Sequence, residues 1–250
     1  MSRIKRFMVI SCWIAIGAFV AWSFFKVQNT SAQATTEGDA ALPVAKIVVP
    51  KDKAIYKWDT LVNYEIVVSD RGKSTKYQEI PSNEVLLKTM YIPDLSRAHV
   101  NSPPPAPESS GLTDIMRSNC LGCHEFKSRA MGPSFAVIAK RYPDTASTID
   151  TLSQHIREGS AGAWGQAQMP PHADLTAKDL HDISFWIMKH AADPDINYYV
   201  GTEGSFSMKA PVTPGPGAGI LLTASYTRPD AEIPGQQIVH GEDTIVVEGK

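Results

Sequence analysis

The string Cys120-Leu121-Gly122-Cys123-His124 constrains this chain more than any other feature. Two thiols three positions apart can each add to one vinyl group of a single porphyrin, and the histidine directly after them can ligate the iron. A thioredoxin-like redox pair would need a strand–helix context, and a zinc site would need a second ligand pair. The remaining cysteine, Cys12, lies in an apolar N-terminal run. The string therefore predicts one covalently attached haem c and, with it, electron transfer.

The N-terminal segment predicts export. Basic residues at the start of the chain precede an uncharged apolar stretch from Met8 to Phe25, and Ala32-Gln33-Ala34 forms a small-residue cleavage pattern. The apolar stretch is also long enough to span a bilayer. Residues 1–34 are thus either a signal peptide or a membrane anchor. Both interpretations place the remainder of the chain on the periplasmic side of the bacterial inner membrane, anchored or soluble.

Alternating apolar runs before the haem string predict a β domain at residues 42–98. The runs are rich in β-branched residues and are separated by turn residues; they are Val44 to Val49, Leu61 to Val68 and Glu84 to Ile92. An immunoglobulin-like β-sandwich fits this spacing. The strand that ends in Pro50, together with Tyr64 to Asp70, resembles the PKD-like β modules that accompany haem domains in some exported bacterial proteins.

A β-rich segment is also expected after the haem string, at residues 192–250. Its strand-like runs are Tyr198 to Met208, Gly219 to Tyr226 and Ile238 to Val247. These strands could complete the N-terminal sandwich, form a module of their own or dock on a partner. The pattern does not choose between these three arrangements.

Between the two β regions, helical periodicity predicts an all-α unit at residues 111–191, after a proline-rich linker at 99–110. A first short helix leads into Cys120, and another is expected from Phe135 to Tyr142. We expect Thr148 to cap a longer helix that ends at Gly159, and Thr176 with Asp179 to start the last one. Because the unit is small, we expect the haem to complete its core.

Met169 is the best candidate for the second axial ligand of the iron. It follows His124 at a distance that lets the chain pass around the porphyrin, and Pro170 and Pro171 stiffen the segment. Met131 follows His124 so closely that the intervening chain would have no slack. His172 is a more serious alternative, and bis-histidine ligation would lower the reduction potential.

The helical unit resembles the small bacterial class I cytochromes c over residues 112–190. Beyond the haem string, the resemblance rests on Met131-Gly132-Pro133-Ser134, on Gly162 to Pro171 with its Gly-x-Trp-Gly-x-x-x-Met-Pro-Pro pattern, and on Trp186. It implies that the Pro133 carbonyl accepts a hydrogen bond from the His124 ring and that Trp164 donates its indole N–H to a haem propionate. Trp186 would pack near the haem edge, although core packing explains it equally well.

One departure from this family concerns His172, because relatives often have asparagine after the Met-Pro-Pro sequence. A neutral His172 ring could serve the same purpose near the methionine sulfur. Protonation of that ring would add positive charge near the iron and raise the reduction potential, which predicts a modest pH dependence. The other histidines have no partner motif and are interpreted as lying on surfaces or helix faces; they are His99, His155, His181, His190 and His240.

Three functions are compatible with these features. The chain is a one-electron carrier, or a fixed subunit of a larger membrane or periplasmic redox complex, or a haem peroxidase or gas sensor with an open sixth position. The first two are not enzymatic, and no nucleophile–base arrangement is visible. The partners expected are redox proteins, which include the other subunits of a larger complex if the chain is such a subunit, and the membrane if the N-terminal helix is not cleaved. A net charge of −2 disfavours nucleic acid.

Overall fold

The computed structural model describes residues 42–97, 110–228 and 240–250. All of these described residues belong to one compact unit. The predicted signal or anchor segment, and the linker except for Ser110, lie outside the described residues. Within the described ranges, no helix is long and apolar enough to cross a bilayer.

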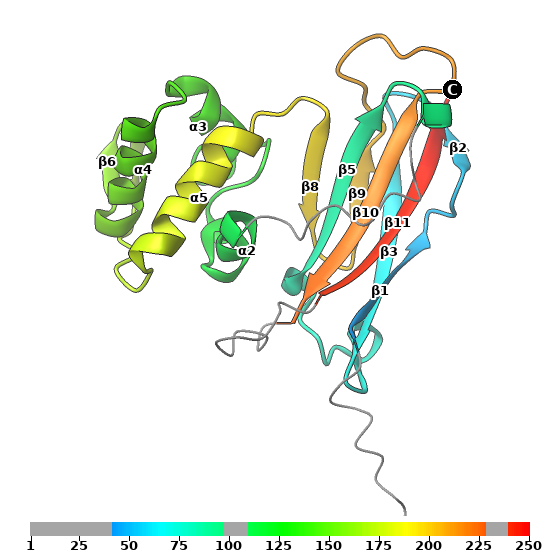
Figure 1. Cartoon of the computed structure of the whole chain (residues 1–250), viewed down its shortest axis with the longest axis horizontal. Helices are drawn as coiled ribbons and strands as arrows, with labels where there is room; N and C mark the ends of the chain where they lie inside the picture. The colour runs from blue at the N-terminus through cyan, green and yellow to red at the C-terminus, as the bar shows by residue number, and fades with distance from the viewer. Residues whose placement is uncertain (1–41, 98–109, 229–239) are drawn as a thin grey trace, which may run out of the picture. The chain divides into compact units, whose positions relative to one another are not determined.

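Strands from both sides of the haem string form two sheets (Figure 1). In the first sheet, β3 pairs with each of the other three strands; its members are β1 (Val44–Val49), β3 (Leu61–Asp70), β4 (Lys73–Ser74) and β9 (Glu203–Ser207). The second sheet has the order β2 (Ala54–Tyr56), β11 (His240–Gly249), β10 (Gly219–Thr227), β5 (Val85–Ile92) and β8 (Ile196–Val200). Only the β2–β11 pair in it is parallel.

The two sheets share one apolar core. Along β3, exposed and buried residues alternate, so that Val62, Tyr64, Ile66 and Val68 lie on one face. These side chains belong to the same buried cluster as those of β5, β10 and β11, including Leu87, Leu222 and Val247. Period-two burial on facing sheets is the pattern of a β-sandwich. We call these nine strands the β-sandwich; its classification as immunoglobulin-like stays a prediction.

The C-terminal strands complete the sheet begun by the N-terminal ones. β10 pairs with β5 from Gly219 opposite Ile92 to Tyr226 opposite Val85. Of the three arrangements that the sequence left open, the structure therefore has the first. The single strand expected from Tyr198 to Met208 was wrong: Gly201, at φ 123°, separates β8 from β9, and the two strands join different sheets.

Along the chain, the helices come between two strands that are neighbours in the second sheet. β5 pairs with β8, with Met90 opposite Ile196, and the chain between these strands contains α2 (Ser110–Arg117), α3 (Phe135–Arg141), α4 (Ala146–Glu158) and α5 (Ala177–His190). We call residues 110–191 the helical unit. It is an insertion in the β-sandwich, attached to it at both ends.

Close packing of α2 on α5 depends on a glycine. A Cβ atom at Gly111 would lie 2.1 Å from the Asp182 carbonyl oxygen, a distance that no side chain can adopt. Leu112 and Ile115 of α2 then pack beside Leu180 and Ile183 of α5 in one buried cluster. This contact brings the segment that precedes Cys120 against the last helix.

The helix ends follow their capping residues. Thr176 and Asp179 form the expected capping box at the start of α5, and Gly159 ends α4 as expected. Thr148 as the cap of α4 was wrong, because Thr145 occupies that position and its hydroxyl accepts a hydrogen bond from the Thr148 amide at 3.2 Å. Short 3-10 turns also occur, at Thr75–Tyr77, Ser82–Glu84, Leu95–Arg97 and Cys120–Gly122.

Candidate haem site

A tight turn sets the spacing of the haem string. Residues Cys120–Gly122 form a 3-10 turn directly after α2, and the Cys120 carbonyl accepts hydrogen bonds from the amides of Cys123 and His124, at 3.2 and 2.9 Å. Asn119 enters the turn with a positive φ of 57°. The turn brings both thiols and the His124 ring to the wall of one cavity.

That cavity collects all the site residues predicted from the sequence. It has a volume of about 1260 Å³, part of it open to solvent, and is lined by Cys120, Cys123, His124, Pro133, Trp164 and Met169. Apolar side chains from three helices complete the wall, including Ile138, Leu152 and Ile187. A large apolar cavity with two thiols, an imidazole and a thioether on its wall suits a covalently bound porphyrin.

The His124 ring is held from two sides. Its Nδ1 lies 2.6 Å from the Pro133 carbonyl oxygen. The Nδ1–H can therefore donate a hydrogen bond to that oxygen, while Nε2 stays available to bind iron. The ring also stacks on Phe135, with centroids 5.4 Å apart and planes at 17°. A Cβ atom at Gly132 would lie 2.6 Å from His124 Cε1, so only glycine lets the backbone pass there.

The Cys120 thiol does not have the character of a redox or metal-binding thiolate. Burial raises its pKa to about 11, whereas reactive thiols have a lowered pKa. In the described ranges, no group of three or more His, Cys, Asp or Glu side chains could hold a metal ion. The raised pKa disfavours a redox or metal-binding role for the Cys120 thiol.

Met169 lies at the end of a hairpin that the sequence did not predict. β6 (Ser160–Gly162) pairs with β7 (Gly165–Met169), with Ser160 opposite Met169. Gly159, at φ 81°, allows the close approach, because a Cβ atom there would lie 2.7 Å from the Met169 carbonyl oxygen. The Met169 side chain is partly buried against the helical core. The hairpin thus fixes where the thioether enters the cavity.

The two rival ligands differ in their surroundings. Met131 lines the cavity but is 66% exposed. His172 also lines it, and its amide donates a hydrogen bond to the Ile156 carbonyl at 3.0 Å. The structure places both Met169 and His172 at the wall, so the choice of Met169 as ligand stays a prediction.

Trp164 lies beside a cation. The Arg141 guanidinium carbon is 4.2 Å from the centroid of the indole ring, and Nη1 of the same side chain donates to the Ala163 carbonyl at 2.7 Å. A Trp N–H donor beside a fixed guanidinium suits an anionic carboxylate. Arg141 was missed from the sequence, where it resembled one of several surface cations at a helix end.

The structure adds detail to the interpretation of two further residues. His155, interpreted as a surface or helix-face histidine, lies on α4 and lines the cavity next to Ile156. Trp186 is only 1% exposed and packs against the rings of Phe126, Phe135 and Tyr198. It is not among the lining residues, so core packing describes it better than contact with the haem edge.

Comparison with known proteins identifies the helical unit. A family model described as Cytochrome c matches residues 113–191. Cytochrome c-552 of Nitrosomonas europaea is 33% identical over 72 residues, 29% of this chain and 70% of the relative. Cytochrome c-551 of Allochromatium vinosum is 33% identical over 82 residues, which are 32% of this chain and 87% of the relative. Cytochrome c-551 of Azotobacter vinelandii is 37% identical over 73 residues, which are 28% of this chain and 85% of the relative.

These relatives are electron-carrier cytochromes rather than enzymes. The prediction of covalent haem c is confirmed, since the Cys-x-x-Cys pair at Cys120 and Cys123 lies within the matched domain. The chain is a mono-haem c-type cytochrome with redox proteins as partners. This chain therefore belongs to the cytochrome c family, and its residues 113–191 form a class I cytochrome c domain that resembles the bacterial cytochromes c-551 and c-552.

Proposed function

We propose that this protein transfers single electrons on the periplasmic side of the bacterial inner membrane, as a fixed subunit of a larger membrane or periplasmic redox complex. The observation that carries the proposal is the insertion of the cytochrome domain between the paired strands β5 and β8. The haem, when bound, supplies a reversible one-electron couple. The side chains of the cavity would hold the haem in place and limit its contact with water.

The site residues have separate roles in this proposal. Cys120 and Cys123 would hold the haem through two thioether bonds, and His124 and Met169 would bind its iron. The Pro133 carbonyl orients the His124 ring, supported by the 2.6 Å contact at Nδ1. Trp164 would donate its indole N–H to a haem propionate, and the neighbouring Arg141 guanidinium would favour that negative charge.

The β-sandwich favours a fixed subunit over a free shuttle. The matched region spans 87% of the Allochromatium vinosum relative, so an electron carrier of this family needs little beyond the helical unit. The sandwich is additional structure with its own core, and it attaches to the cytochrome domain at both ends. A freely diffusing electron carrier does not need such an additional domain, whereas a subunit of a complex needs a surface that binds the other subunits.

The location is proposed from the N-terminal segment. Residues 1–34 carry the export pattern, and haem c attachment suits the periplasmic side. A mature N-terminus at Thr35 would identify a cleaved signal and leave no anchor. Recovery of the intact segment in washed membranes would identify an anchor.

Purification of the native protein under mild conditions tests the subunit proposal. We expect the cytochrome to co-purify with other redox proteins at a defined stoichiometry, and to lose them only when the complex is dissociated. A monodisperse, freely diffusing monomer in the native extract would show a free carrier.

Binding of carbon monoxide by the ferrous wild-type protein would instead show an open sixth position, as in a peroxidase or gas sensor.

A further inference from the structure

A tyrosine of the β-sandwich is part of the core of the cytochrome domain. Tyr198 lies in β8 and is 7% exposed. Its ring centroid is 5.0 Å from that of Phe126 and 5.5 Å from that of Trp186. The family match ends at residue 191, so Tyr198 comes from outside the cytochrome domain as its relatives define it.

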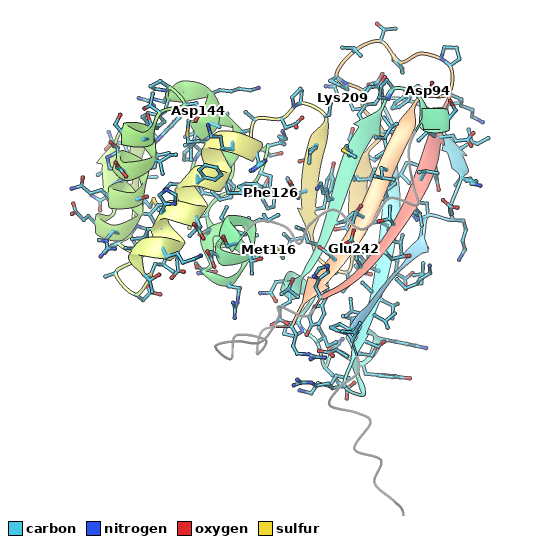
Figure 2. The ribbon with its side chains drawn as sticks, in the orientation of Figure 1. Asp94, Met116, Phe126, Asp144, Lys209 and Glu242 are labelled. Carbon is cyan, nitrogen blue, oxygen red and sulfur yellow. The ribbon has the colours of Figure 1, made fainter. Side chains whose placement is uncertain are left out.

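Phe126, which Figure 2 shows between the helices and β8, connects this tyrosine with the wall of the haem site. Its ring lies 5.8 Å from Phe135 in an edge-on arrangement, and Phe135 in turn stacks on His124 at 5.4 Å. Trp186 packs against both phenylalanines. Four rings in sequence, from Tyr198 through Phe126 and Phe135 to His124, thus link β8 with the expected proximal ligand.

A lysine next to Phe126 connects the backbone after the haem string with the backbone before β8. Lys127 follows Phe126 directly, and its Nζ donates to the carbonyls of Ala191, at 3.1 Å, and of Asp193. These carbonyls lie between the end of α5 and the start of β8. The segment that carries His124 is therefore tied to the chain entering β8 by a charge-assisted hydrogen bond as well as by ring packing.

We propose that Tyr198 is a positioning residue for the haem: through Phe126 and Phe135 it holds the His124 ring in the orientation that the Pro133 carbonyl fixes. The β-sandwich then stabilises the part of the haem site that contains His124, in addition to being the domain into which the helical unit is inserted. Close-packed interiors transmit displacements because they contain few voids, so a cavity beneath Phe126 would free Phe135 and the ring stacked on it. This inference rests on the proposed ligation of iron by His124.

Nuclear magnetic resonance of the full-length, haem-loaded protein tests the proposal. We expect Tyr198→Ala to speed solvent exchange of the His124 ring N–H about tenfold or more, which corresponds to roughly 1.4 kcal/mol at 25 °C, and to shift the midpoint potential. Tyr198→Phe should restore both values, since the ring remains. Phe185→Ala is the matched control, because Phe185 lies on α5 but is 40% exposed and outside the four rings; it should change neither.

The outcomes are distinguishable. Unchanged exchange and potential in a folded Tyr198→Ala variant would overturn the proposal. If that variant does not fold, the wild-type protein still decides: proton contacts between the Phe126 and Tyr198 rings support the proposal, and their absence contradicts it. If His124 proves not to ligate the iron, the proposed function itself fails. If ligation is intact and only the exchange is insensitive to Tyr198, the inference alone fails.

Discussion

The β-sandwich and the helical unit form their cores in different ways. In the β-sandwich, side chains from both sheets fill the interior, and Val68, Leu87, Leu222 and Val247 have no exposed surface. The helical unit instead surrounds an open cavity with apolar walls. We therefore expect the β-sandwich to fold as a polypeptide alone, and the helical unit to depend on haem for its folding.

The largest effect should follow from preventing haem attachment. In a Cys120→Ala/Cys123→Ala variant, apolar wall residues such as Ile138 and Leu152 would face an empty cavity, at about 1.5–3 kcal/mol for each large side chain left exposed. We expect the helical circular dichroism signal to be mostly lost while the β-sandwich stays folded. Amide exchange measured along the chain checks this, and a fully folded helical unit without haem would contradict the comparison.

A large effect confined to the β-sandwich is expected from its buried ion pair. Arg228 donates to Asp70 through Nε at 3.0 Å and Nη2 at 2.5 Å, and both side chains are 7% exposed. Asp70→Ala would remove both of these hydrogen bonds to a charged group and should lower the free energy of unfolding of the sandwich by about 2–3 kcal/mol. Denaturant unfolding measures this loss. The control is Asp243→Ala, which removes an ion pair to the exposed Lys46 and a hydrogen bond from the Ile47 amide and should cost less.

An effect confined to the haem site is expected from Gly132→Ala. Since the added Cβ would lie 2.6 Å from His124 Cε1, the ring or the backbone must move, at a cost of about 1–3 kcal/mol. We expect a changed midpoint potential with unaltered unfolding of the β-sandwich. Gly215→Ala serves as control, because nothing lies within 4 Å of its added Cβ. Equal effects of the two substitutions would show that the Gly132 contact is unimportant.

The smallest effect concerns a carboxyl group between α2 and α5. Burial, with Asp179 and Asp182 nearby, raises the pKa of Asp114 from 3.8 to about 6. Because the folded pKa lies above the unfolded one, the stability that protonated Asp114 provides is fully present below about pH 4 and is lost as the pH rises through 6. Asp114→Asn should remove this dependence and stabilise the protein at pH 7 on the order of 1 kcal/mol, allowing for solvent screening. Urea unfolding at pH 4 and 7 measures the difference; an unchanged profile would exclude Asp114 as its source.

The haem site was largely predictable from the sequence because its chemistry is local. Cys120, Cys123 and His124 are adjacent along the chain, and the structure brings Pro133, Trp164 and Met169 to the same cavity wall. His155 and Arg141 were missed because their roles depend on which helix face borders the cavity. Helical periodicity predicts which segments form helices, but it does not tell whether a polar residue on a helix faces solvent or a cofactor.

The strands were predictable individually, but their pairing was not. Alternation identified β1 with its observed bounds and β3 nearly so. The partnership of β10 with β5 joins residues more than a hundred positions apart, and no local pattern encodes it. The alternation also continued across Gly201, which concealed the turn between β8 and β9. The β6–β7 hairpin was missed because its short strands are mostly exposed and carry no apolar alternation.

The identity of the second axial ligand is the most direct test of the proposed electron-transfer site. We expect the oxidised holoprotein to show the weak red absorption band of sulfur-to-iron charge transfer, and we expect Met169→Ala to abolish it. His172→Asn should retain the band, because that residue is proposed not to ligate the iron. If the wild-type protein lacks the band, or if it persists in Met169→Ala, then Met169 is not the ligand and the proposed site is wrong.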